Sequence, residues 1–132
     1  MTNDEQIFLT CEAHFDAAHN LINYVGKCAQ MHGHRWVVKA EFGPYTEAEL
    51  DQAGIAVDFK AVKKVLNDVI DPFDHEYLNN FFERPSAELI ALRIFRDMSL
   101  VIRDTPNCEH IRISAIEVFE SPESKCRVTH GS

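Results

Sequence analysis

The alternation of apolar and polar residues predicts four β-strands. From Ile7 to Phe15 every second residue is apolar or small, and from Arg35 to Phe42 the alternation is cleaner, as in a strand with one face on a core. We expect Gly43-Pro44 to end this second strand. Alternating and β-branched residues return from His110 to Phe119, and Lys125 to His130 offers a short last strand.

Two helices are predicted between the second and third strands. Asp58 can cap the first helix, whose apolar residues recur at helical spacing until Pro72 stops it. Ser86, directly after Pro85, can cap the second, and Thr105-Pro106-Asn107 closes it. The order strand, strand, helix, helix, strand, strand contains no repeat or linker. It predicts one α+β domain over residues 1–132, with an antiparallel four-stranded sheet covered by two helices.

The composition limits the compartment and the partners. A chain of 132 residues that is 45% hydrophobic can build one core. It has neither an apolar run of membrane-spanning length nor the pattern of a signal peptide, so we expect a cytoplasmic protein without a membrane partner. The net charge of −8 argues against nucleic acid as a partner. The four cysteines are irregularly spaced, which favours free thiols. A phosphorylated substrate would need locally gathered basic residues, for which the candidates are Lys27, Arg35, Lys125 and Arg127.

Three histidines carry the strongest chemical signal. His32 and His34 lie just before the predicted strand that begins at Arg35, and residues two apart on a strand point to the same side, so the two side chains can share one ion. His19 follows the first strand, and antiparallel pairing of the first two strands can bring it alongside the other two. Three imidazoles with no fourth protein ligand leave a zinc ion open to water or substrate. The pattern therefore predicts a catalytic metal site.

Other interpretations of these residues stay open. Cys28 and His32 could form a structural zinc site with Cys108 and His110, although the pairs do not have the form of compact zinc knuckles. The histidines could also stabilise a non-catalytic binding module. A thiol hydrolase using Cys28 and His75 would need no metal at all.

Three further positions have chemical potential. Cys28 lies four residues before His32 and beside a lysine, and a nearby cation and metal lower the pKa of a thiol, so its thiolate can act as a base. Asp74-His75 follows the first helix, and an aspartate that orients a histidine makes a proton relay. Glu120 ends an apolar strand, either as a solvated acid or as a carboxylate that anchors a guanidine-like ring edge.

Five motifs follow one another along the chain: Phe15-Asp16-Ala17-Ala18-His19, Cys28-Ala29-Gln30-Met31-His32-Gly33-His34, Val57-Asp58-Phe59, Asp74-His75-Glu76-Tyr77-Leu78-Asn79 and Pro85-Ser86-Ala87-Glu88. Together they resemble the pyruvoyl- and carboxytetrahydropterin synthase family. The resemblance implies a tunnelling fold, in which subunits assemble through their sheets into a barrel. It further implies a homohexamer of two trimers, with active sites between subunits.

The resemblance also implies roles for single residues. The zinc ligands would be His19, His32 and His34; the catalytic residues Cys28, Asp74 and His75; and the pterin contacts Glu120 and Ser86. The implied substrate is 7,8-dihydroneopterin triphosphate, and the implied enzyme is a lyase. The three-residue gap between Cys28 and His32 favours the branch that makes 6-carboxy-5,6,7,8-tetrahydropterin for queuosine synthesis. The alternative is the pyruvoyl branch, which eliminates triphosphate.

Overall fold

The computed structural model describes residues 4–21 and 26–131, apart from the side chains of residues 27 and 28. Its strands are β1 (Ile7–His19), β2 (His32–Tyr45), β3 (Glu76–Tyr77), β4 (Ile113–Ser121) and β5 (Ser124–Thr129). Its α-helices are α1 (Phe59–Ile70) and α2 (Ala87–Asp104). Four short 3₁₀ helices complete the list: η1 (Gly26–Ala29), η2 (Glu47–Glu49), η3 (Asp71–Phe73) and η4 (Leu78–Asn80).

The strands form one sheet in the order β3-β1-β2-β4-β5. The four long strands are antiparallel to their neighbours, as predicted, and the α+β class is confirmed. The fifth strand, β3, was not predicted, because two residues are too few to show an alternating pattern. It runs parallel to β1, pairing Glu76 with Ala17 and Tyr77 with Ala18. This pairing holds the segment after α1 beside the end of β1.

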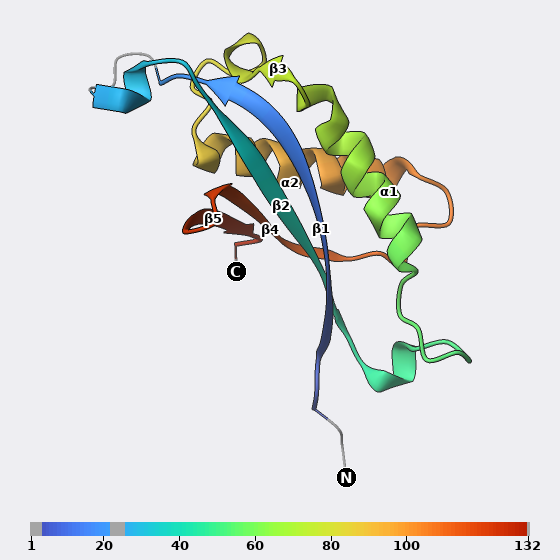
Figure 1. The fold of residues 1–132 in the computed structure, drawn as a ribbon. Coiled ribbons are helices and arrows are strands. Elements are labelled where there is room, and N and C mark those ends of the chain that lie inside the picture. Colours follow the sequence, from blue (N-terminus) through green and yellow to red (C-terminus); the bar gives the residue numbers. More distant parts are fainter. Residues whose placement is uncertain (1–3, 22–25, 132) are drawn as a thin grey trace.

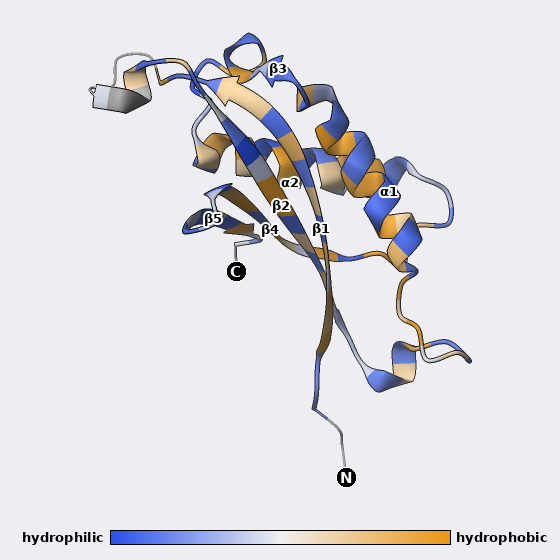
Figure 2. Cartoon of the chain, viewed as in Figure 1, coloured by the Kyte–Doolittle hydropathy of each residue, from blue (hydrophilic) through white to orange (hydrophobic). Residues whose placement is uncertain are grey.

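The core lies between the sheet and the two helices, which cover one of its faces (Figure 1). Figure 2 shows apolar and polar residues alternating along β2, as the sequence pattern requires of a strand with one buried face. From β2 this face contributes Trp36, Val38, Ala40 and Phe42, none of them accessible to solvent. Both predicted caps are present, since Asp58 accepts a hydrogen bond from Lys60 N and Ser86 accepts one from Leu89 N.

Several strand boundaries differ from the prediction. The third predicted strand was to begin at His110, but β4 begins at Ile113. The predicted end of β2 at Gly43-Pro44 is wrong, because the strand continues to Tyr45. Ile7 pairs with Tyr45 and Leu9 with Phe42, so Gly43 and Pro44 stand opposite the single residue between them in β1. Such a bulge in β2 tolerates a proline, which has no N–H donor. Gly43 has a φ of 144°, and a Cβ there would lie 2.8 Å from Ile7 O, so glycine is needed.

A further difference in strand boundaries bears on the histidines. β1 and β2 pair up to His19 and His32, beyond the predicted limits at Phe15 and Arg35. All three histidines therefore lie on strands, with His19 as the last residue of β1. No helix in the described ranges has the length and apolar character needed to cross a membrane.

Candidate metal centre

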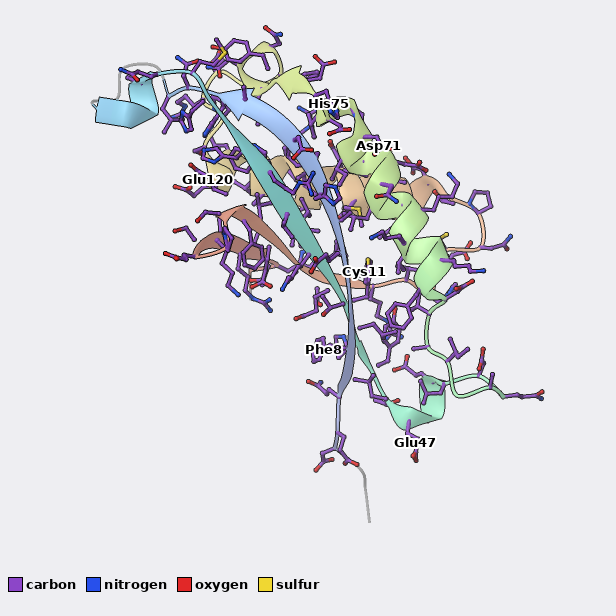
Figure 3. All side chains as sticks on the ribbon, viewed as in Figure 1. Phe8, Cys11, Glu47, Asp71, His75 and Glu120 are labelled. Atoms are coloured by element: carbon purple, nitrogen blue, oxygen red, sulfur yellow. The ribbon has the colours of Figure 1, made fainter. Side chains whose placement is uncertain are left out.

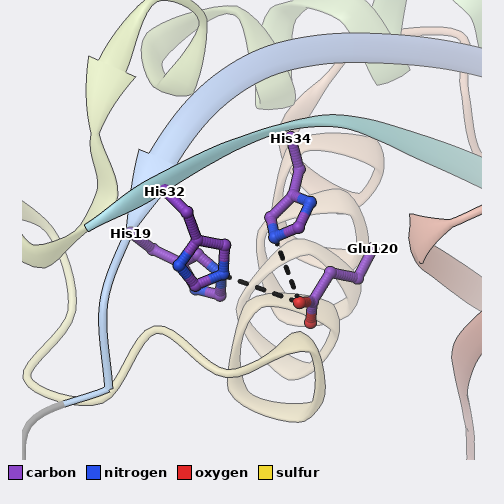
Figure 4. A group of neighbouring side chains, drawn as sticks. All are labelled: His19, His32, His34 and Glu120. Carbon is purple, nitrogen blue, oxygen red and sulfur yellow. Dashed lines mark hydrogen bonds and ion pairs between the residues drawn. The ribbon is translucent and has the colours of Figure 1, made fainter. Parts of the chain in front are cut away.

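The pairing of β1 with β2 brings the three histidine rings together. His19 pairs with His32, and Ala17 pairs with His34. The ring centroids are 4.5 Å apart for His19 and His32, 4.6 Å for His32 and His34, and 5.3 Å for His19 and His34 (Figure 4). The side chains point to the side of the sheet that the helices cover, where His19 is only 1% exposed.

Backbone carbonyls fix the orientation of two of the rings. His19 Nδ1 lies 2.7 Å from the carbonyl oxygen of Pro85, and His32 Nδ1 lies 2.7 Å from that of Gln30. A carbonyl only accepts, so each Nδ1 carries the proton and donates it. In neutral rings, both Nε2 atoms then present a lone pair. A hydrogen bond from Nδ1 to a carbonyl, with Nε2 left free to bind, is typical of metal-binding histidines.

The two Nε2 atoms of His19 and His32 lie 3.1 Å apart. Two lone pairs at this distance repel each other, whereas a cation placed between them is attracted to both. A proton between the two Nε2 atoms would relieve the repulsion of this pair only. The wider arrangement contains two further donors, His34 Nε2 and a Glu120 carboxylate oxygen, and all four ligand atoms lie within 4.8 Å of one another. These residues therefore fit a metal ion.

Glu120 is a fourth potential ligand that the sequence did not place here. Its Oε1 lies 3.2 Å from His34 Nε2 and 3.8 Å from His19 Nε2. His34 Nε2 is buried, and among the described residues it makes no hydrogen bond of good geometry. Burial lowers the pKa of His34, Glu120 opposes this, and the neighbouring His32 and His19 lower it further. The lower pKa favours the neutral imidazole that a metal ion needs.

Trp36 packs against the histidine cluster. It is fully buried, and its indole N–H donates to Ala17 O over 3.2 Å. Its ring meets the His19 ring edge-on at a centroid distance of 4.9 Å and the His34 ring at 5.5 Å. The alternation from Arg35 to Phe42 predicted only that Trp36 lies on one face of a strand. Trp36 comes two residues after His34 on the same strand face, and this spacing could have predicted that it contacts the histidine cluster.

Asn79 fixes the chain immediately after His19. Its side-chain oxygen accepts from Asn20 N over 3.0 Å, and its amide nitrogen donates to Asn20 O over 2.9 Å. Tyr77 donates from its hydroxyl to the Asn20 side chain. These contacts join the η4 segment to the end of β1. No local sequence pattern predicts this role for Asn79, because the contact spans 59 residues.

Asp74 and His75 form a second cluster, with Asp16. His75 Nδ1 lies 2.9 Å from Asp74 Oδ2, while Asp74 Oδ1 accepts from Asp16 N over 3.0 Å. His75 N donates to Asp16 O over 2.6 Å, and His75 adopts a left-handed φ of 60°. The hydrogen bond from Asp16 N is the main cause of the lowered pKa of Asp74. The His75 side chain is 78% exposed and labelled in Figure 3. The predicted pair is thus formed, but outside the histidine cluster.

The remaining candidates have mixed outcomes. The backbone of Cys28 belongs to η1, but its side chain lies outside the described residues. Cys108 and His110 do not join the histidine cluster within the described ranges. The Ser86 hydroxyl accepts from Leu89 N over 3.2 Å and so caps α2. Cys11, Cys108 and Cys126 are free thiols, as predicted.

Three of the four basic residues considered for phosphate binding are engaged with carboxylates. Arg35 donates from Nε and Nη2 to Asp16, over 3.0 Å and 3.2 Å. Lys125 bonds to Glu117, and Arg127 lies 3.5 Å from Glu41. The Lys27 side chain lies outside the described residues.

Comparison with known proteins identifies the family. The model of the 6-pyruvoyl tetrahydropterin synthase family matches residues 8–131. This chain belongs to that family. It is 28% identical over 131 residues to the 6-carboxy-5,6,7,8-tetrahydropterin synthase of Haemophilus influenzae, covering 87% of this chain and 93% of that one. It is also 34% identical over 82 residues to the dihydroneopterin monophosphate aldolase of Pyrococcus furiosus, covering 62% and 66%.

A solved structure confirms the tunnelling fold. The 6-pyruvoyl tetrahydropterin synthase of Caenorhabditis elegans superposes with a TM-score of 0.79 over 99% of this chain and 100% of that one. The two sequences are 22% identical, so this likeness bears on the fold alone. The chain is therefore a pterin lyase of this family with a histidine cluster suited to a metal ion.

Proposed function

We propose that the protein is a zinc-dependent lyase that converts 7,8-dihydroneopterin triphosphate and one water molecule into 6-carboxy-5,6,7,8-tetrahydropterin, acetaldehyde and triphosphate. The observation that carries this proposal is the convergence of His19 and His32, with their Nε2 atoms 3.1 Å apart and their Nδ1 atoms bonded to carbonyls. His34 is the third histidine donor, and a Glu120 carboxylate oxygen lies within 4.8 Å of the three histidine nitrogens. The name of the Haemophilus influenzae relative supports the carboxy branch.

His19, His32 and His34 would hold the zinc ion. When bound, zinc supplies Lewis acidity, which acidifies hydroxyl groups on the substrate side chain. Three neutral imidazoles leave the charge of the ion uncompensated, which strengthens this effect and leaves a coordination position for the substrate. The carbonyls of Pro85 and Gln30 hold two of the rings in the required tautomer.

Glu120 would orient the pterin ring. A carboxylate can accept two hydrogen bonds from the guanidine-like edge of a pterin. The contacts of Glu120 with His19 and His34 both involve its Oε1 atom. Glu120 also lines a groove of about 590 Å³, together with Val37 and Phe119. An apolar wall beside a carboxylate suits a flat heterocycle with N–H donors.

Cys28 and the Asp74–His75 pair would transfer protons. The Cys28 thiolate would remove a proton from the substrate side chain, and His75 would deliver or remove one on the other side. Asp74 accepts from the ring of His75 and so fixes its orientation. The strongly exposed His75 side chain suits a role at the site of a neighbouring copy. We therefore also propose a homohexamer of two trimers, with active sites between subunits, in the cytoplasm.

Product analysis tests this proposal. The zinc-loaded protein is incubated with 7,8-dihydroneopterin triphosphate, and the products are identified by mass spectrometry. Cys28→Ala is compared with Cys126→Ala, which removes a free thiol on β5. We expect the 6-carboxy product and acetaldehyde from the wild type and from Cys126→Ala, but not from Cys28→Ala.

Other results would redirect the assignment. A pyruvoyl product would move the protein to the pyruvoyl branch. Turnover of the monophosphate alone would favour an aldolase like the Pyrococcus furiosus relative. Bound metal without any turnover, together with unfolding when the metal is removed, would favour a metal-stabilised binding module.

A further inference from the structure

The backbone of Asp16 holds the Asp74–His75 pair in place. His75 N donates to Asp16 O over 2.6 Å, and Asp74 Oδ1 accepts from Asp16 N over 3.0 Å. His75 has a left-handed φ of 60°, which a residue other than glycine keeps only where its surroundings require it. The next residue, Glu76, pairs with Ala17 in the parallel β3–β1 ladder. The main chain of β1 therefore fixes the place of His75, whatever side chain stands at position 16.

The Asp16 side chain puts a second carboxylate beside His75. One carboxylate oxygen of Asp16, one of Asp74 and a ring nitrogen of His75 all lie within 4.8 Å of one another. Asp74 Oδ2, at 2.9 Å from Nδ1, is the acceptor of the ring. An N–H makes one hydrogen bond of good geometry, so a freely turning Asp16 carboxylate would compete with Asp74 for it. The proposed proton transfer therefore needs Asp16 to be held away from the ring.

Arg35 holds both oxygens of the Asp16 carboxylate. Its Nε donates to Oδ1 over 3.0 Å and its Nη2 donates to Oδ2 over 3.2 Å. Two hydrogen bonds of this kind fix the plane of a carboxylate and offset its charge. The Arg35 side chain is 63% exposed and that of Asp16 is 39% exposed, and ion pairs this exposed add little to stability. The contact thus fixes the position of the carboxylate without much effect on the stability of the fold.

Arg35 also links the Asp74–His75 pair to the strand that carries two of the histidines. Asp16 and Arg35 are direct partners in the β1–β2 pairing. Arg35 follows His34 on β2, and consecutive residues of a strand point to opposite faces. His34 belongs to the histidine cluster on the helix-covered face, whereas Arg35 meets Asp16 on the other face. One strand therefore positions a histidine of its own metal centre and, through Asp16, the surroundings of His75.

We propose that Arg35 is a positioning residue, which holds the Asp16 carboxylate away from the His75 ring so that Asp74 accepts from the ring. This inference rests on the proposed function, in which His75 transfers a proton. Arg35 acts through Asp16 and contacts neither the reacting atoms nor the metal ion. Its role depends on the Asp16 carboxylate, so a chain without that carboxylate does not need Arg35.

The test compares two variants with a control. Arg35→Gln frees the Asp16 carboxylate, and the double variant Asp16→Ala/Arg35→Gln removes that carboxylate as well. Arg103→Gln is the matched control, because Arg103 is an exposed arginine in the last turn of α2 that pairs with Asp104 over 3.2 Å. For each zinc-loaded protein, kcat and KM for 7,8-dihydroneopterin triphosphate are measured, together with zinc content, melting temperature and mass in solution. Crystal structures show which carboxylate accepts from the His75 ring.

We expect Arg35→Gln to lower kcat roughly tenfold or more and to leave KM within about twofold, because a misdirected proton-transfer group slows the reaction without weakening binding. In its crystal structure, Asp16 should compete with Asp74 for the His75 ring. The double variant should recover kcat to within about threefold of the wild type. Zinc content, melting temperature and mass should match the wild type throughout, as should every property of Arg103→Gln.

Several results would overturn this inference alone. An unchanged kcat in Arg35→Gln would do so, and so would a double variant that fails to recover, because Arg35 would then act on the substrate directly. A raised KM with normal kcat would assign Arg35 to substrate binding, and lost zinc or a changed mass would assign it to the metal site or a subunit contact. Absence of turnover by the wild type would overturn the proposed function. The crystal structure of Arg35→Gln then decides alone, and an unchanged Asp74–His75 contact would overturn the inference too.

Discussion

Replacing Asn79 with alanine tests how the end of β1 is held at His19. The change removes two hydrogen bonds, of 3.0 Å and 2.9 Å, between the Asn79 amide and the backbone of Asn20. Each such bond contributes roughly 0.5–1.5 kcal/mol, so we expect a loss of about 1–3 kcal/mol in the free energy of unfolding. For a domain of this size, about 4 °C in melting temperature is lost per kcal/mol. Because His19 is the adjacent residue, metal affinity should fall by roughly 10- to 100-fold, as for other groups that position ligands.

Asn80→Ala provides the matched control for this prediction. Asn80 is the next residue, carries the same side chain and is exposed. Urea unfolding of the metal-free proteins gives the loss of stability, and competition with a chelating dye gives the metal affinity. We expect Asn80→Ala to stay within about 0.5 kcal/mol of the wild type. Equal effects of the two substitutions, or an unchanged metal affinity in Asn79→Ala, would refute the reasoning.

Three further predictions follow from the contacts around the site and at the far end of the sheet. Trp36→Ala should lower the free energy of unfolding by about 3–5 kcal/mol, because it empties a fully buried site, and urea unfolding checks this. Ser86→Ala should cost about 1 kcal/mol through loss of the N-cap of α2, whereas Ser86→Asn should keep the stability in the same assay. Arg112 is the main cause of the low pKa of Glu49, about 2 against an ordinary 4.5, so this contribution to stability is complete above pH 4.5 and is lost as the pH falls toward 2. The difference in melting temperature between the wild type and Glu49→Gln should therefore shrink over this range, and a constant difference would contradict the assignment.

The part of the site that could be predicted from the sequence follows from strand periodicity. Residues two apart on a strand share a face, so His32 and His34 had to point the same way. One antiparallel pairing then sufficed to bring His19 to them, since β1 and β2 are the first two strands. The fold class was predictable for a similar reason, because the alternating and helical periods are distinct along most of the chain.

The parts that could not be predicted depend on register and on long-range contacts. The approach of Glu120 to His34 requires the register of β4 against β2, which no local pattern specifies. The carbonyl of Pro85 reaches His19 across 66 residues, and a backbone acceptor has no signature in the side-chain sequence. The parallel pairing of β3, which positions the segment that carries His75, involves only two residues.

Metal content is the most direct test of the central claim that the histidine cluster is a metal centre. The wild type, His34→Ala and His14→Ala are each mixed with equimolar zinc and dialysed. Inductively coupled plasma mass spectrometry then gives the zinc content per chain. His14 is the control, because it is an exposed histidine on β1 outside the cluster. We predict one zinc ion per chain for the wild type and His14→Ala, and none for a folded His34→Ala. A wild type that retains no zinc, or a His34→Ala variant that retains as much as the wild type, would contradict the claim.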